Sequence, residues 1–276
     1  MAVIQSLPQE LLDHILDNIP GDTRTLKTAS TVSKAWRTRS QVRIFSKFTL
    51  DFRNMERIYS ETPDSPEAAG PRKLFSIVFS HVRDLDIDAR KITSLKNHGE
   101  YLEILRSFTN LTSLRTAYWS FQEFERRYIN HLFGHFDKTV KTLELVDCFL
   151  DSEVLIFLMS LFLHVDNLSV DPRLPSDLKT YKIQDADRSR SVGFRGNLVF
   201  EHMRPLHEEF LAFVDDHCSD VRSIIAHSCE SRGALGNLFQ RQGHKLTSVG
   251  VGLTGKAGEF TSTVRRCVPP FPHNNP

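Results

Sequence analysis

The stretch VKTLEL, residues 140–145, decides how this chain folds, because its pattern returns along the sequence at a nearly constant distance. Apolar residues occupy its first, fourth and sixth positions. Six segments share the pattern, and they begin at Val82, Leu111, Val140, Val165, Val221 and Leu246. The first four starts are 29, 29 and 25 residues apart, and the last two are 25 apart. Such recurrence is typical of a repeat protein built from one supersecondary unit.

The spacing also indicates what each unit contains. A unit of this length has room for one short strand, a turn and one helix. Apolar residues at helical spacing support this in the intervening segments 100–108, 121–136, 152–163, 206–217 and 235–242. We expect two less regular copies between Val165 and Val221, around residues 178–183 and 196–200. The prediction is an α/β fold, an irregular right-handed solenoid of strand–helix units over residues 81–254.

One alternative fold stays open. Strand–helix alternation also builds a doubly wound α/β domain with a flat parallel sheet. We prefer the solenoid, because recurrence at a fixed period is stronger support than alternation alone.

The chain before the array has a different pattern, LPQELLDHILDNIPGDTRTLKTASTVSKAWRTRSQVRIF over residues 7–45. Ser6 and Gln9 have the spacing of a capping box, and Pro20 ends a first helix. A second helix is expected from Asp22 as N-cap, and a third from Ser30 or Thr31. A three-helix unit this small buries little, so we expect another surface to cover part of its apolar stripe.

These residues carry a specific resemblance. The order Leu7-Pro8-x-Glu10, Ile15-Leu16, Leu26, Val32-Ser33-Lys34-x-Trp36-Arg37 and Phe45 resembles the F-box motif, which docks proteins onto the Skp-type adaptor of SCF ubiquitin ligases. The alternative is an ordinary helical cap on the following domain. The resemblance implies adaptor contacts from Leu7, Pro8, Leu11, Leu12, Ile15, Leu16, Leu26, Val32 and Trp36.

The array has a resemblance of its own. Cys148 and Cys229 fall at one offset in their repeats, where leucine-rich repeats carry Asn or Cys beside the turning backbone. Arg90, Trp119 and Arg173 hold that offset elsewhere, so the repeats are degenerate. The whole chain resembles the F-box/leucine-rich-repeat proteins. Outward positions of successive strands are expected to form a target-binding face, namely Asp84, Asp86, Asp88, Arg115, Glu144, Ser169, Lys182 and His227.

The resemblance implies a function without catalysis by this chain. A substrate-recognition subunit of an SCF-type ubiquitin ligase would hold the adaptor, and through it a cullin-RING core, while its repeats hold a target protein. One alternative is a repeat-based interaction scaffold that binds the adaptor without promoting substrate turnover. Another is an enzyme with an unrecognised site, although no phosphate-loop, dinucleotide, hydrolase or zincin motif occurs.

Bulk properties narrow the partners and the compartment. A net charge of +1 favours neither nucleic acid nor anionic lipid as the principal partner. The longest apolar run, residues 154–163, is too short to span a bilayer, and no secretory signal is seen. The four cysteines are scattered without a CxxC pair, which favours a reducing compartment, the cytosol or nucleus.

Two groupings suggest metal ions but fit them poorly. His131 and His135 lie four apart without a third ligand nearby. The run Asp84, Asp86, Asp88 lacks the Gly and Glu that a calcium loop places at its sixth and twelfth positions. We expect no metal and no cofactor.

The sequence predicts four segments. These are the helical unit 1–46, a connecting strand and exposed loop 47–80, the array 81–254 and a poorly ordered tail 255–276. The Gly and Pro residues of the tail suit neither a strand nor a helix that could cap the array. The strand at 246–251 is therefore expected to be an open edge. The chain would then be a shortened form of a longer repeat protein, or a partner would cover its end.

Overall fold

The computed structural model describes most of the predicted elements and leaves gaps between them. The described residues are 8–19, 23–51, 78–91, 104–119, 129–130, 133–162, 164–173, 193–202, 207–218, 220–227 and 232–251. Predictions for residues 174–192 and for the tail 255–276 therefore lie outside the described residues.

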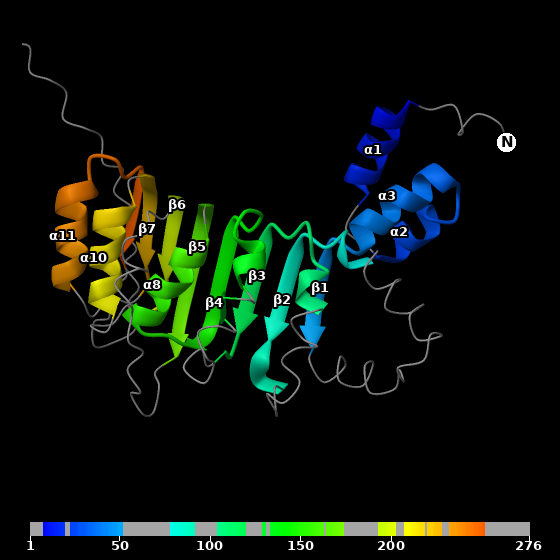
Figure 1. Cartoon of the computed structure of the whole chain (residues 1–276). Helices are drawn as coiled ribbons and strands as arrows, with labels where there is room; N and C mark the ends of the chain where they lie inside the picture. Colours follow the sequence, from blue (N-terminus) through cyan, green and yellow to red (C-terminus); the bar gives the residue numbers. More distant parts are fainter. Residues whose placement is uncertain are drawn as a thin grey trace, which may run out of the picture.

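The centre of the fold is an eight-stranded, entirely parallel sheet (Figure 1). Its strands are β1 (Lys47–Asp51), β2 (Asp84–Asp88), β3 (Ser113–Ala117), β4 (Thr142–Phe149), β5 (His164–Arg173), β6 (Gly193–Phe200), β7 (Asp220–Ala226) and β8 (Ser248–Val251). The strands lie side by side in chain order. A doubly wound sheet reverses its strand order at a switch point. The described sheet has no reversal, so the doubly wound alternative is wrong and the α/β class with parallel strands is confirmed.

The strand register matches the repeat alignment. The fourth residues of the six repeat segments, together with Leu198 of β6, pair from strand to strand in the series Leu85, Leu114, Leu143, Leu168, Leu198, Ile224 and Val249. Successive partners are 29, 29, 25, 30, 26 and 25 residues apart. Since side chains alternate between the two faces of a strand, this common register brings all seven to one face. The first six are buried in the core, and the partly buried Val249 packs against it.

The start of the sheet and the number of strands between β5 and β7 differ from the prediction. Strand β1 pairs with β2, so the sheet begins at Lys47 and not at residue 81. Between β5 and β7 the sheet holds one strand, β6, which pairs directly with both neighbours. The copy expected around 196–200 is therefore present as β6. The copy expected around 178–183 lies outside the described residues.

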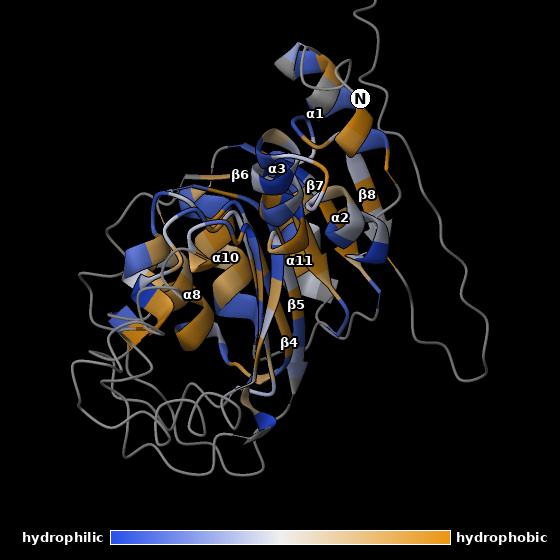
Figure 2. Cartoon of the chain, turned by 90° about the vertical axis from the view of Figure 1, so that its right-hand side faces the viewer, coloured by the Kyte–Doolittle hydropathy of each residue, from blue (hydrophilic) through white to orange (hydrophobic). Residues whose placement is uncertain are grey.

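Helices cover the apolar side of the sheet. Helix α8 (Ser152–Leu161) is buried from Val154 to Ser160, and α10 (Glu208–His217) packs against both α8 and α11 (Arg232–Gln242). In Figure 2, α8 and α10 lie on one side of β4 and β5. Two 3-10 helices complete the described array, η3 (Ala89–Lys91) and η6 (Gly134–Phe136). The opposite side of the sheet carries polar side chains, and we call it the polar face.

Three helices precede the sheet, as the sequence predicts. They are α1 (Gln9–Asn18), α2 (Thr23–Ala29) and α3 (Lys34–Ile44). The predicted start of α3 is wrong, because its N-cap is Ser33, whose hydroxyl accepts a hydrogen bond from the Trp36 N–H. The hydroxyls of Ser30 and Thr31 instead donate to carbonyls at the end of α2. The predicted capping box is also wrong, since α1 begins at Gln9 itself.

Candidate interaction surfaces

The helical unit α1–α3 exposes large apolar side chains. Leu11 is 49% exposed, Ile15 41% and Val32 52%, and these are the exposed large hydrophobic residues of the described chain. Leu11 and Ile15 are four apart on α1 and so share one helix face. Val32 lies in the turn between α2 and α3. We call these three residues the apolar patch.

The packing of α1 on α3 explains why the patch faces outward. Leu16 is 1% exposed, so α1 turns that side inward. The Asp13 carboxylate pairs with the Arg39 guanidinium of α3 at 3.0 Å, and Arg43 Nη2 donates to the Ile19 carbonyl at 3.4 Å. Asp13 is two residues away from both Leu11 and Ile15, so it lies about 160° around the helix from each of them. The face of α1 that docks on α3 is therefore opposite the one that carries Leu11 and Ile15.

The remaining predicted adaptor contacts divide into three groups. Pro8 is exposed and Trp36 is partly buried, so both can contribute to a surface. Leu16 and Leu26 are buried inside the unit, so they hold the helices together and are not accessible to a partner. Leu7 and the side chain of Leu12 lie outside the described residues.

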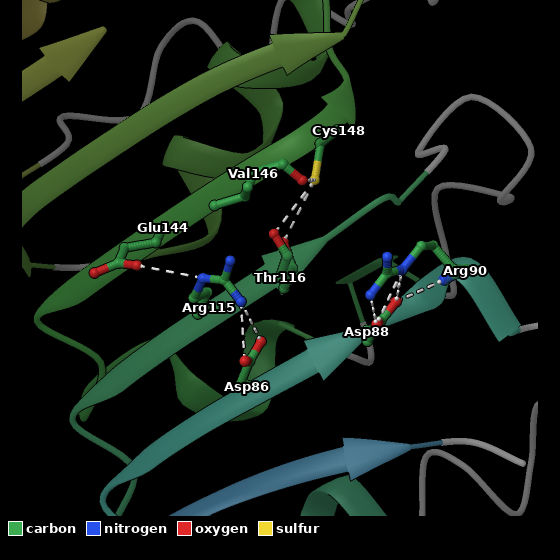
Figure 3. Close-up of polar contacts among 8 residues, drawn as sticks. All are labelled: Asp86, Asp88, Arg90, Arg115, Thr116, Glu144, Val146 and Cys148. Carbon is green, nitrogen blue, oxygen red and sulfur yellow. Dashed lines mark hydrogen bonds and ion pairs between the residues drawn. The ribbon is translucent and has the colours of Figure 1, made fainter. Parts of the chain in front are cut away.

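On the polar face, a row of charges crosses three strands. Arg115 of β3 stands between Asp86 of β2 and Glu144 of β4, which are its register partners (Figure 3). Arg115 Nη1 donates to both Asp86 carboxylate oxygens at 2.9 Å, and its Nε lies 3.7 Å from Glu144 Oε2. These side chains stay 34–43% exposed. The row is therefore ordered by mutual pairing and still accessible to a partner.

The same row becomes apolar toward the end of the sheet. Ser169, Val199 and Ile225 continue it across β5, β6 and β7, and Gly250 ends it on β8. Val199 and Ile225 are partly buried. A partner lying along the row would meet charges over β2–β4 and aliphatic groups over β6 and β7.

A second charged group lies where β2 and β3 end. Arg90 in η3 folds back so that its Nη2 lies 2.6 Å from Asp88 Oδ2 (Figure 3). The guanidinium carbon of Arg90 lies 4.2 Å from the ring centre of Tyr118. The hydrogen bond to Asp88 is the main cause that raises the Arg90 pKa. Sequence reasoning missed Arg90 and Tyr118. In the sequence, Arg90 stood out only because it occupies the repeat position that Cys148 occupies in another repeat.

Cys148 occupies the same repeat position as Arg90, and its thiol is buried. Its Sγ lies within hydrogen-bonding distance of the carbonyls of Thr116 in β3 at 3.5 Å and Val146 in β4 at 3.4 Å (Figure 3). Burial raises the pKa of this thiol to about 11. The thiol is therefore buried against backbone carbonyls of two neighbouring strands, beside an irregularity in the register of β4. Cys229 lies outside the described residues.

An acidic region lies where β4–β6 end. Burial and then the nearby Asp147 raise the pKa of Asp171. The His227 ring, just after β7, lies 3.8 Å from a carboxylate oxygen of Glu201.

Among the predicted target contacts, the six from Asp84 to Ser169 lie on the polar face, His227 is exposed beside it, and Lys182 lies outside the described residues. Sequence reasoning missed Asp171, which directly follows the repeat that begins at Val165, and Glu201, which follows the less regular copy at 196–200.

Other kinds of site have little support. In the described ranges, no group of three or more His, Cys, Asp or Glu is placed to hold a metal ion. A groove of about 560 Å³ lies between α10 and α11, lined in part by Leu211, Asp215 and Asn237. Arg241 crosses it and pairs with Asp215 at 3.0 Å, so its main charges are already matched. Among the described helices, none combines the length and hydropathy needed to cross a membrane.

Comparison with known proteins adds no family to this geometry. No family model matches the chain. No curated protein matches it either. The two surfaces, the apolar patch and the polar face, must therefore carry the functional argument.

Proposed function

We propose that this chain is a substrate-recognition subunit of an SCF-type ubiquitin ligase in the cytosol or nucleus. The observation that carries the proposal is the apolar patch. Leu11, Ile15 and Val32 stay exposed on a small three-helix unit. Ile15 and Val32 stand at positions of the F-box pattern, and the resemblance also implies an adaptor contact from Leu11. Exposed apolar groups of this kind mark a protein–protein interface, and the resemblance names a Skp-type adaptor as the partner.

The sheet would supply the other half of the function. Sequential parallel strands at 25–30 residues support a leucine-rich-repeat-like solenoid. Its polar face would hold the target protein. A receptor of this kind acts by proximity, because holding an acceptor lysine near the ubiquitin-carrying enzyme raises its effective concentration. The bond-making chemistry belongs to other subunits.

The test is co-purification with a recombinant Skp-type adaptor. The double variant Leu11→Ala with Ile15→Ala removes two central anchors of the patch and should cost about 2–4 kcal/mol of binding free energy. The control is Asp17→Ala, which changes an exposed residue of the same helix on the side away from Leu11 and Ile15. Circular dichroism verifies that both variants fold. Recovery of the adaptor by the patch variant at wild-type yield would refute the proposal.

Ubiquitin transfer separates the receptor from the scaffold alternative. A reconstituted ligase with the intact chain should modify a protein captured on the polar face. Adaptor binding and target capture without transfer would favour the scaffold.

A further inference from the structure

Residues 23–50 form a strongly basic segment in an almost neutral chain. They contain seven Lys and Arg and no Asp or Glu, against +1 for the whole chain. The basic residues are Arg24, Lys27, Lys34, Arg37, Arg39, Arg43 and Lys47. The overall balance therefore hides a local excess of positive charge on α2 and α3. In Figure 2, α3 is drawn largely in the hydrophilic colour, whereas α1 carries a hydrophobic stretch.

Part of this charge has no acidic partner among the described residues. Arg39 pairs with Asp13 at 3.0 Å, and Lys47 lies 3.9 Å from Asp84. Lys27, Lys34 and Arg37 are exposed, and in the described part of the chain none of them has a carboxylate within ion-pair distance. We call these three residues the basic rim.

The basic rim lies beside Val32, the residue of the apolar patch that stands between α2 and α3. Lys34 follows Val32 by two residues and opens α3, and Arg37 lies one turn further along the same side. Arg37 Nε donates to the Ser30 carbonyl at 3.4 Å, which folds this side chain back toward the turn that carries Val32. A partner that covers Val32 therefore approaches Lys34 and Arg37.

We propose that the surface covering the apolar patch is acidic beside its apolar centre, and that the basic rim pairs with those acids and accelerates association. The inference rests on the proposed function, since it states the chemistry of the adaptor surface at the same patch. Exposed interfacial charges act mainly on the association rate and its salt dependence.

The charges of α1 favour a protein over a polyanion. Glu10 and Asp17 are exposed on the helix that presents Leu11 and Ile15, and this helix carries no Lys or Arg. An anionic membrane or a nucleic acid that approached the patch would be repelled by these carboxylates. A folded protein can instead place its acids opposite α3 and leave α1 facing uncharged groups.

The experiment measures association between the full chain and a recombinant Skp-type adaptor by stopped flow, at low and at physiological salt. For the wild type, the association rate constant should fall by about tenfold as salt rises. The variant Lys34→Glu with Arg37→Glu should associate about tenfold more slowly at low salt, with little change in dissociation. The control, Lys138→Glu with Lys141→Glu, makes the same change of net charge at exposed sites away from the helical unit and should match the wild type.

The outcomes separate this inference from the proposed function. Binding at equal rates by the wild type and the rim variant, with no salt dependence, would overturn the inference and leave the receptor proposal standing. A rim variant that keeps its adaptor kinetics but loses binding to anionic vesicles or duplex DNA would assign the basic rim to a polyanion and also overturn it. If the wild-type chain does not bind the adaptor at any salt concentration, both this inference and the proposed function are refuted.

Discussion

The Ser46 carbonyl accepts a hydrogen bond from the Arg83 N–H at 2.8 Å, and this contact ties the end of the helical unit to the strand neighbouring β1. Helix α3 ends at Ile44 and β1 begins at Lys47, so only Phe45 and Ser46 separate them. The Ser46 hydroxyl also donates to the Arg43 carbonyl at 2.8 Å. The helical unit and the sheet therefore meet without a flexible linker.

The first prediction tests this junction. Inserting a Gly-Ser pair repeated three times between Phe45 and Ser46 should release the helical unit from its fixed orientation. Small-angle X-ray scattering should then show a larger and broader distribution of shapes than the wild type. Ser46→Ala keeps the backbone contact to Arg83 and should scatter as the wild type does. An unchanged scattering curve for the insertion would mean that contacts outside the junction hold the two parts together.

The second prediction concerns the charge row. Arg115→Met should lower the free energy of unfolding by no more than about 1 kcal/mol, because partly exposed ion pairs contribute little. Adding Asp86→Asn should recover part of the loss, since it removes the carboxylate left without its partner. Urea unfolding measures both changes. A loss of several kcal/mol would show that the row is part of a buried network.

The third prediction compares two glycines. Gly196 has a φ of +137°, and a Cβ there would lie 2.1 Å from the Asp166 carbonyl oxygen. Gly196→Ala should therefore destabilise the protein by about 2 kcal/mol or more. Gly236 lies inside α11 with open space around it, so Gly236→Ala should stabilise by about 0.5–1 kcal/mol. Thermal unfolding of the two variants should shift in opposite directions, and a shift in the same direction would contradict the argument.

The fourth prediction follows from the buried thiols. Burial raises the pKa of Cys148 to about 11 and that of Cys218 to about 12, from an ordinary value of 9.0. Above pH 9 the unfolded chain loses these protons while the folded chain keeps them. Stability contributed by the protonated thiols is thus complete below pH 9 and is lost as pH rises toward 11 and 12.

Urea unfolding at pH 8 and pH 10 measures this effect against the other groups that titrate in the same range. The variant Cys148→Ala with Cys218→Ala should lose less stability between the two pH values than the wild type. Both thiols should also resist an aromatic disulfide reagent in the native protein at pH 8. Equal pH dependence in the variant and the wild type would rule out this contribution.

The repeat register could be predicted because one physical constraint acts on every unit. Leu114 and Leu143 must both reach the core from strands of period two, and a slip by one residue would turn them to the polar face. The strand at β1 was predicted as a connection, but the same constraint could not place it in the sheet. Phe48 and Leu85 pair across 37 residues, well beyond the period of the other units.

Local hydrogen-bonding choices were less predictable. Ser30, Thr31 and Ser33 are all good N-caps by type, and the structure shows that the first two close α2 while the third opens α3. The pairing of Arg90 with Asp88 and Tyr118 depends on how the chain leaves β2, which hydrophobic periodicity does not encode. The apolar patch was predictable in part: Leu11 and Ile15 are exposed as expected, whereas Leu16 is needed inside.

Because the strands lie in chain order, the polar face also sets the length of a partner segment that can lie across it. Neighbouring strands lie about 4.8 Å apart, so the row from Asp86 on β2 to Gly250 on β8 extends over about 29 Å. An extended peptide of about nine residues covers that length. Neighbouring strands would contact positions about one and a half residues apart in a segment laid across them. Losing or gaining one unit would therefore change the length of the segment that fits by one or two residues.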